Sequence, residues 1–409
     1  MSEIRPFPSG RPSRELAARV ASVPYDVLDT KEARALADGN AVSFLHVCRP
    51  EIDLPEGTDL YSDAVYAQGR KNLDRFYAEG TLQEDAVPRL FVYRQTWRGR
   101  KQDGLVAAVS VEDYDADVIK KHEKTRADKE NDRVRHVLTQ SAHSEPVFLT
   151  YRGTDAIDAR IAQVTAREAE FDFEAPDGVG HTLWIVPDDD VSFFVEAFRE
   201  ISALYVADGH HRCASASRAR AALREKEPAL SPEHPVSWFP ATIFPERELR
   251  ILPYNRIVKD LNGRTPEALL EEISTAFGVT SGSTSEPGGK GEMKMFLGGT
   301  WYGLRPLAPV DASDPIRSLD VSVLQDRLLA PILGIGDPRT DKRIDFVGGI
   351  RGTAELEQRV SSGAAAVAFS MYPTTLGELL AIADAGETMP PKSTWFEPKL
   401  RSGLFVHRF

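Results

Sequence analysis

The sequence has few of the residues and patterns that mark several common classes of protein. Only two cysteines, Cys48 and Cys213, occur among 409 residues, and no C-x-x-C pair is present. Their scarcity argues against a disulfide scaffold, a zinc ribbon or a dithiol redox site and indicates a reducing compartment. No apolar run of about 18 residues is long enough to cross a membrane, and the first residues contain no apolar signal core. We therefore expect a cytoplasmic protein with no membrane partner.

The balance of charge limits the partners further. Asp and Glu number 62 against 50 Lys and Arg, which gives a formal net charge of −12. A uniformly acidic surface repels phosphate backbones, so we expect no nucleic-acid partner. The hydrophobic fraction of 42% and the charged fraction of 27% are typical of a globular protein. The length allows two or three domains, and homo-oligomerisation is left open.

Alternating apolar and turn patterns predict a mixed α/β protein built on a mixed sheet. We expect an N-terminal α/β region 1–89, a core 90–260 that contains Asp208–Arg212, and a C-terminal α/β region 261–409, the extent of the core being set by the family resemblance described below. We expect helices at 61–79, 154–169, 192–201 and 210–224. We expect strands at 43–47, 90–95, 104–111, 146–151, 181–186, 204–207 and 236–244, the last one pairing with 248–254.

A strand-like run, Leu204-Tyr205-Val206-Ala207, leads directly into Asp208-Gly209-His210-His211-Arg212 and a predicted helix. Free backbone N–H groups and the positive end of a helix dipole suit a phosphate, and Gly209 lets the backbone approach it closely. Arg212 can hold phosphate oxygens with two donors, while a histidine can transfer a proton or bind a metal. The simpler alternative makes Asp208 a helix N-cap and the histidines filler residues. Side chains of His210 and His211 should diverge by about 100°, so we expect them to differ in role.

The segment 120–136 is strongly charged, and Thr125 followed by Asp128 predicts a capping box with a helix beginning near Arg126. Lys129, Arg133 and His136 would then share one face of that helix and suit an anionic ligand. The alternative is a solvated helix laced with ion pairs.

Two further polar residues, His122 and Glu123, precede the predicted helix in a loop, where catalytic groups often lie. Glu123 could act as a general base toward a hydroxyl, with His210 or His211 as its proton partner and His122 contacting the substrate. Asp208, followed by Asp26, is the next candidate for the catalytic base. The pair does not form H-E-x-x-H, so zinc-protease chemistry is not indicated.

Weaker candidates lie near the two ends of the chain. Asp26, in Pro-Tyr-Asp, could contribute a carboxylate to a substrate, although a turn role explains it equally well. Lys392 and Ser393 follow two prolines that hold the backbone extended, and they could contact a substrate or simply fix the tail. Gly348-Gly349 lacks the spacing of a dinucleotide fingerprint.

The Asp-Gly-His-His-Arg turn resembles the signature turn of ParB/sulfiredoxin-like proteins, a superfamily that includes nucleotide-binding partition proteins, sulfiredoxins and free-serine kinases. The resemblance implies that Gly209 and Arg212 hold nucleotide phosphates within a ParB/sulfiredoxin-like core that carries N- and C-terminal additions. Because Cys213 follows Arg212 rather than lying inside the turn, sulfiredoxin chemistry is not implied. Nearly the whole chain also resembles the domain of unknown function 1015 family, through the segments 23–28, 120–136, 207–212, 252–256 and 389–396.

Together these features predict a nucleotide-dependent phosphotransferase that uses ATP or ADP, with Mg²⁺, and acts on a small hydroxyl-bearing metabolite such as free serine. Arg212, Lys129 and Arg133 would clamp the phosphates, because phosphoryl transfer requires mainly positioning and charge neutralisation. A phosphatase of a small phosphorylated metabolite and a non-catalytic nucleotide-binding regulator remain as alternatives. In each case the partner is a small phosphorylated molecule.

Overall fold

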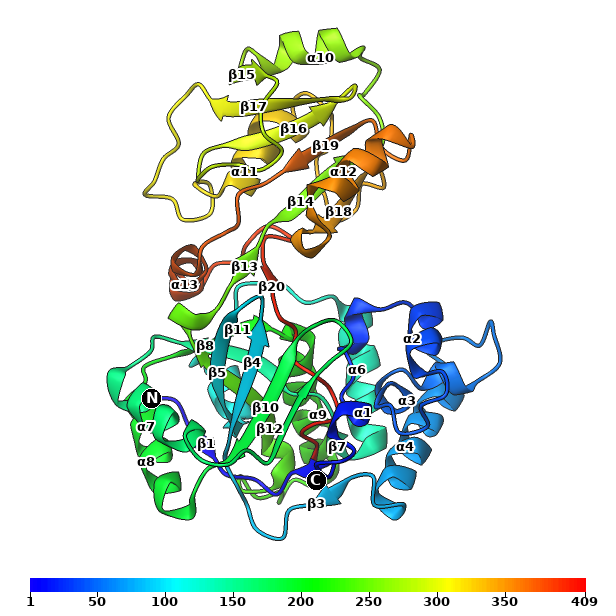
Figure 1. Cartoon of the computed structure of the whole chain (residues 1–409), viewed down its shortest axis with the longest axis vertical. Coiled ribbons are helices and arrows are strands. Elements are labelled where there is room, and N and C mark those ends of the chain that lie inside the picture. Colours follow the sequence, from blue (N-terminus) through cyan, green and yellow to red (C-terminus); the bar gives the residue numbers. More distant parts are fainter. The chain divides into compact units, whose positions relative to one another are not determined.

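The computed structural model describes residues 1–409 and separates into two compact units (Figure 1). Unit 1 comprises Met1–Leu249 together with the returning segment Pro398–Phe409, and unit 2 comprises Arg250–Glu397. The regions 1–89 and 90–249 thus lie in one unit, and the chain leaves that unit and re-enters it near the C-terminus. The expected division into three regions stays a prediction.

Unit 1 is built on a nine-stranded mixed sheet with the order β6-β11-β8-β12-β5-β4-β10-β9, and β1 pairs with β5. The pairs β11–β6 and β12–β8 are parallel, and the other pairs are antiparallel. The predicted mixed α/β class is therefore confirmed. The strands are β1 Ile4–Arg5, β4 Phe91–Trp97, β5 Arg100–Ser110, β6 Ile119–Lys120, β8 Val147–Tyr151, β9 Phe171–Glu174, β10 Gly180–Ile185, β11 Leu204–Asp208 and β12 Trp238–Pro245.

The central strands of this sheet are buried on both faces. All residues of β8 and β12 and the first four of β11 are buried, which explains their continuous apolar sequence. Strands β4 and β5 pair antiparallel and form a hairpin. Its turn residues Arg98 and Gly99 have φ values of 49° and 73°, as the twist of a two-residue hairpin requires.

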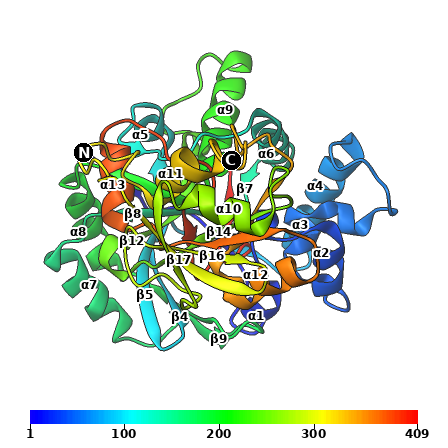
Figure 2. The same cartoon turned by 90° about the horizontal axis from the view of Figure 1, so that it is seen from above.

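Nine α-helices and two short two-stranded sheets, called ribbons below, complete unit 1 (Figures 1 and 2). The ribbons pair β2 Gly10–Arg11 with β3 Gln83–Glu84 and β7 Ala142–His143 with β21 His407–Arg408. The helices are α1 Ala17–Val20, α2 Thr30–Ala37, α3 Leu45–Cys48, α4 Asp63–Ala78, α5 Val111–Asp115, α6 Ala127–Gln140, α7 Asp155–Thr165, α8 Asp188–Arg199 and α9 His210–Lys226.

One predicted strand of unit 1 is wrong, because residues 43–47 lie partly in helix α3. Phe44, Leu45, Val47 and Cys48 are all buried, which is helical spacing rather than strand alternation. The side chain of Asn72 in α4 donates to the carbonyl oxygen of His46 at 2.6 Å. Packing against a neighbouring helix therefore outweighs the β propensity of this short apolar run.

Unit 2 contains an antiparallel six-stranded sheet with the order β15-β17-β16-β19-β14-β18 and a separate ribbon of β13 and β20. The strands are β13 Ile251–Leu252, β14 Tyr254–Val258, β15 Phe277–Ser281, β16 Met293–Leu297, β17 Thr300–Pro306, β18 Ile344–Gly348, β19 Val367–Ser370 and β20 Trp395–Phe396. The helices are α10 Pro266–Ile273, α11 Asp320–Leu324, α12 Gly352–Ser361 and α13 Leu376–Asp384.

The predicted pairing of 248–254 with 236–244 is wrong. A 3₁₀ turn at Glu246–Glu248 follows Pro245 and ends β12, and the chain then enters unit 2. There Ile251 and Leu252 pair with Phe396 and Trp395 instead. No helix in either unit is both long and apolar enough to cross a membrane.

Candidate active site

Strand β11 ends in a tight turn that starts helix α9. The pairing of β11 with β8 shifts register between Val206 and Asp208, and Gly209 adopts a φ of 98°. This left-handed conformation favours glycine, so a side chain at position 209 would strain the turn. Helix geometry leaves the N–H groups of His210 and His211 without partners inside the helix, at its positive end. The turn therefore offers backbone donors to an anion.

Arg212 adds a buried cation to these donors. Its exposed fraction is 8%, and its Nη1 donates to the carbonyl oxygen of Pro146 at 2.8 Å. Nη2 lies 3.5 Å from Oδ1 of Asp26, while Nε and Nη2 have no hydrogen-bond partner. Burial alone would lower the pKa of Arg212, but the charges of Asp26, Glu145 and Asp208 raise it, so the guanidinium stays charged. Buried donors without partners are costly and indicate a place for an additional acceptor.

The two adjacent histidines have different neighbours. The rings of His210 and His122 are 4.5 Å apart and nearly perpendicular, and Nδ1 of His210 lies 3.9 Å from Oε2 of Glu123. Burial is the main cause that lowers the pKa of His210 to about 4, and its Nε2 has no hydrogen-bond partner. His211 instead accepts a 3.1 Å hydrogen bond from the backbone N–H of Arg126. The structure thus separates a buried, neutral histidine from one that joins the start of α6 to α9.

Helix α6 and the residues before it lie beside α9, so the two predicted segments meet in unit 1 (Figure 2). The predicted capping box is wrong. The N-cap is Arg126, which makes no side-chain cap hydrogen bond. Thr125 lies one position too early, and its hydroxyl donates to the carboxylate of Glu130 instead.

The three residues expected on one cationic face of α6 have separate surroundings. Arg133 is buried, donates to Asp132 at 2.7 Å and lies with its guanidinium carbon 3.9 Å from the ring centre of Tyr25. The amine of Lys129 donates to the hydroxyl of Tyr61 at 3.3 Å. His136 packs edge-on against Tyr66, with ring centres 4.8 Å apart. Burial, followed by the charge of Arg133, lowers the pKa of His136 well below its usual range, so it carries no positive charge at neutral pH.

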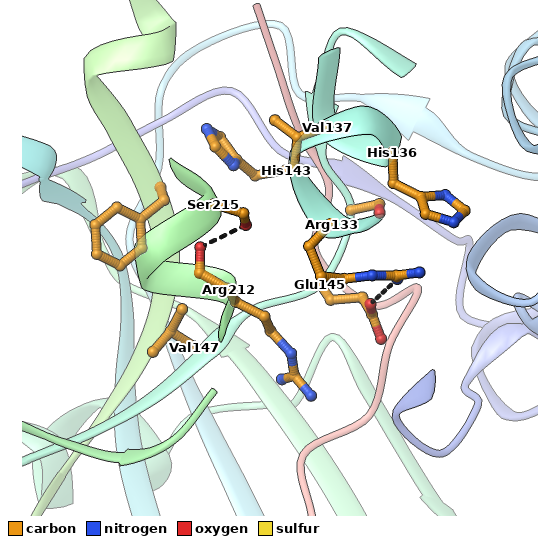
Figure 3. Close-up of a pocket in the computed structure, with 10 residues that line it drawn as sticks. Arg133, His136, Val137, His143, Glu145, Val147, Arg212 and Ser215 are labelled. Carbon is orange, nitrogen blue, oxygen red and sulfur yellow. Dashed lines mark hydrogen bonds and ion pairs between the residues drawn. The ribbon is translucent and has the colours of Figure 1, made fainter. Parts of the chain in front are cut away.

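A small pocket lies between α6 and α9 (Figure 3). Arg133 and Arg212 enter it from the two helices, and Glu145 lies 3.7 Å from Nη1 of Arg133. Lys129 does not line it. The lining residues are Arg133, His136, Val137, His143, Ser144, Glu145, Val147, Arg212, Ser215 and Phe239.

Asp208 makes an ion pair that local sequence patterns missed. The amine of Lys399, in the returning segment, lies 3.2 Å from Oδ2 of Asp208. Burial alone would raise the pKa of Asp208, but Lys399 and Arg212 hold it below its usual range. Asp208 is not the N-cap of α9, because that position is Gly209 and no side chain caps the helix. Lys399 lies 191 residues from Asp208, so no spacing rule could have paired them.

Three weaker candidates divide between the units. Asp26 lies in the 3₁₀ turn Tyr25–Val27 of unit 1 beside Arg212, with 39% of its side chain exposed. Lys392 and Ser393 lie in unit 2. The carbonyl oxygen of Lys392 accepts a 3.1 Å hydrogen bond from Arg256, and the hydroxyl of Ser393 donates to the carbonyl oxygen of Pro390 at 2.7 Å. Their contact with a substrate stays a prediction.

No group of three or more His, Cys, Asp or Glu side chains is arranged to hold a metal ion. Mg²⁺ in phosphoryl-transfer enzymes is commonly held by one or two carboxylates together with the phosphates of the substrate, so its binding would depend on a bound nucleotide.

Comparison with known proteins establishes the family. The model of the family described as Protein of unknown function (DUF1015) matches residues 4–322, so the chain belongs to that family. The expected resemblance to the domain of unknown function 1015 family is thereby confirmed. No curated protein matches the chain.

Several solved structures are similar at low identity. A free serine kinase in complex with AMP is 12% identical, with a TM-score of 0.35 and coverage of 71% of this chain and 86% of that one. A conserved hypothetical protein from Pyrococcus furiosus is 13% identical, with a TM-score of 0.35 and coverages of 73% and 93%. A C-terminally truncated SbnI from Staphylococcus aureus is 14% identical, with a TM-score of 0.38 and coverages of 73% and 85%. Because every TM-score is below 0.5, the likeness transfers neither a ligand nor an activity to this chain.

Proposed function

We propose that unit 1 binds the phosphate groups of ATP or ADP at the start of α9 and transfers a phosphoryl group between the nucleotide and a small hydroxyl-bearing metabolite. Free serine is one candidate acceptor. The observation that carries the proposal is Arg212, a buried cation at the N-terminal end of α9 whose Nε and Nη2 have no hydrogen-bond partner, although Nη2 lies 3.5 Å from Asp26. Backbone donors, a helix dipole and a guanidinium that converge on one place recognise phosphate in many proteins.

The surrounding residues fit the requirements of the transfer. The acceptor hydroxyl oxygen attacks the terminal phosphorus, and the bond from that phosphorus to the bridging oxygen of the nucleotide breaks. The hydroxyl proton passes to the carboxylate of Glu123. Oε2 of Glu123 lies 3.9 Å from Nδ1 of His210, and 43% of the Glu123 side chain is exposed. The guanidinium of Arg212 and the N–H groups of His210 and His211 stabilise the charge on the phosphoryl oxygens.

Two measurements test the proposal. Isothermal titration calorimetry should show that ADP binds the full-length protein. Phosphorus NMR should show that ATP is converted to ADP and a phosphate ester when serine or another small hydroxylated metabolite is present. Tight ADP binding without turnover in either direction would replace the enzyme with a nucleotide-binding regulator. Hydrolysis of phosphate esters without nucleotide would favour the phosphatase.

A further inference from the structure

The returning segment 398–409 reaches the candidate site at two points. Lys399 forms the 3.2 Å ion pair with Asp208, and its carbonyl oxygen accepts a 2.8 Å hydrogen bond from Gln95 in β4. Three residues later, the hydroxyl of Ser402 donates to Glu145 at 2.7 Å. The segment is also anchored by the pairing of β21 with β7. Side chains of this segment thus contact Asp208 and Glu145, two residues of the candidate site.

The ion pair matters because Asp208 immediately precedes the turn that would receive phosphate. Without a neutralising cation, the carboxylate of Asp208 would repel a polyanion bound at the turn. Salt screens this repulsion poorly, because the site is partly buried. Three other titratable groups face Asp208. His210 and His122 have their pKa lowered, primarily by burial, and are neutral at pH 7. Arg212 already lies beside Asp26, so the cation within ion-pair distance of Asp208 is Lys399.

We propose that Lys399 neutralises Asp208 and thereby allows a phosphate-bearing ligand to bind at the start of α9. Lys399 is a positioning residue, because it acts on the ligand through Asp208. The inference rests on the proposed nucleotide site, and it makes the C-terminal segment part of that site. It also implies that a chain ending before residue 398 would bind nucleotide poorly.

The test compares ADP affinities of four variants by calorimetry. Lys399→Met should weaken ADP binding at least about tenfold, the effect of one uncompensated charge several ångströms away in a partly buried site. The double variant Asp208→Asn with Lys399→Met should recover most of the affinity, because the repelling charge is gone. Lys399→Arg should bind nearly as well as the wild type. Arg408→Met is the matched control, since it removes one cation of the same segment from an exposed ion pair with Glu84.

A purely structural role for Lys399 predicts the opposite pattern, in which the double variant binds no better than Lys399→Met. That result would overturn the inference. A second readout does not depend on nucleotide. The pKa of the Asp208 carboxyl, followed by carbon NMR, should rise in Lys399→Met, and an unchanged titration would also overturn the inference. Failure of the wild-type protein to bind ADP, with that pKa rising as expected, would instead count against the proposed function alone.

Discussion

Arg212→Ala is the sharpest perturbation of the proposed phosphate site. The substitution removes Nε and Nη2, two buried nitrogens that have no hydrogen-bond partner and that we propose donate to a phosphate. A hydrogen bond to a charged group contributes about 1.5–3 kcal/mol, so ADP should bind roughly 10- to 150-fold more weakly. Arg212→Lys keeps the charge but lacks the planar pair of donors, so we expect an intermediate loss.

The same substitution has a cost for stability that must be measured beside the affinity. It removes the 2.8 Å hydrogen bond to Pro146, worth about 1.5–3 kcal/mol for a charged donor, and it leaves Asp26 without its cation. Calorimetric ADP titration should therefore be paired with thermal unfolding of each variant. Arg218→Ala is a suitable control, because Arg218 lies on the same helix in an exposed ion pair with Glu130. Unchanged ADP affinity in a folded Arg212→Ala protein would refute the assignment of the phosphate site.

Three further predictions concern chemistry and pH. Glu123→Gln should preserve ADP affinity and lower kcat by about 10²–10⁴-fold, the usual contribution of a general base; full activity would place the base elsewhere, with Asp208 and Asp26 as the next residues to substitute. His210→Ala should weaken ADP binding or turnover. His211→Ala should mainly increase amide exchange at the start of α6, because only His211 bonds to Arg126. Identical effects of the two substitutions would contradict their different roles. Acid should destabilise the protein, because burial lowers the pKa of His210 to about 4 and of His143 to about 3. Above about pH 6.5 both histidines are neutral in the folded and in the unfolded chain, so their burial costs no protonation free energy there. As the pH falls below that value the unfolded chain binds protons that the folded chain excludes, and each histidine should cost up to about 1.4 kcal/mol per pH unit. Urea unfolding at pH 7 and pH 5 measures the loss, and His143→Gln should reduce it.

Much of unit 1 could be predicted from the sequence because its signals are local. Strand β11, the glycine turn and helix α9 follow one another within a short stretch, and periodicity and propensity suffice to recognise them. The segments 120–136 and 208–212 lie beside each other, since His211 accepts a hydrogen bond from Arg126 across the two segments. The assignment of functions to these residues stays a prediction.

The remainder depended on tertiary contacts that no local pattern encodes. Lys399 and Asp208 are brought together only because the chain returns to unit 1 after forming unit 2. Helical spacing placed Lys129 and Arg133 on a common face, yet Tyr61 engages one and Asp132 engages the other. Amphipathic patterning identifies a face of a helix, but the charges packed against that face decide which of its cations can meet a ligand.

A structure of the 409-residue chain with bound ADP would test the proposed phosphate site most directly. We expect the phosphate oxygens of ADP to accept hydrogen bonds from the backbone N–H groups of His210 and His211 and from the guanidinium of Arg212, with Lys399 still paired to Asp208. Phosphates bound at a different surface, with the donors of this turn unused, would contradict it.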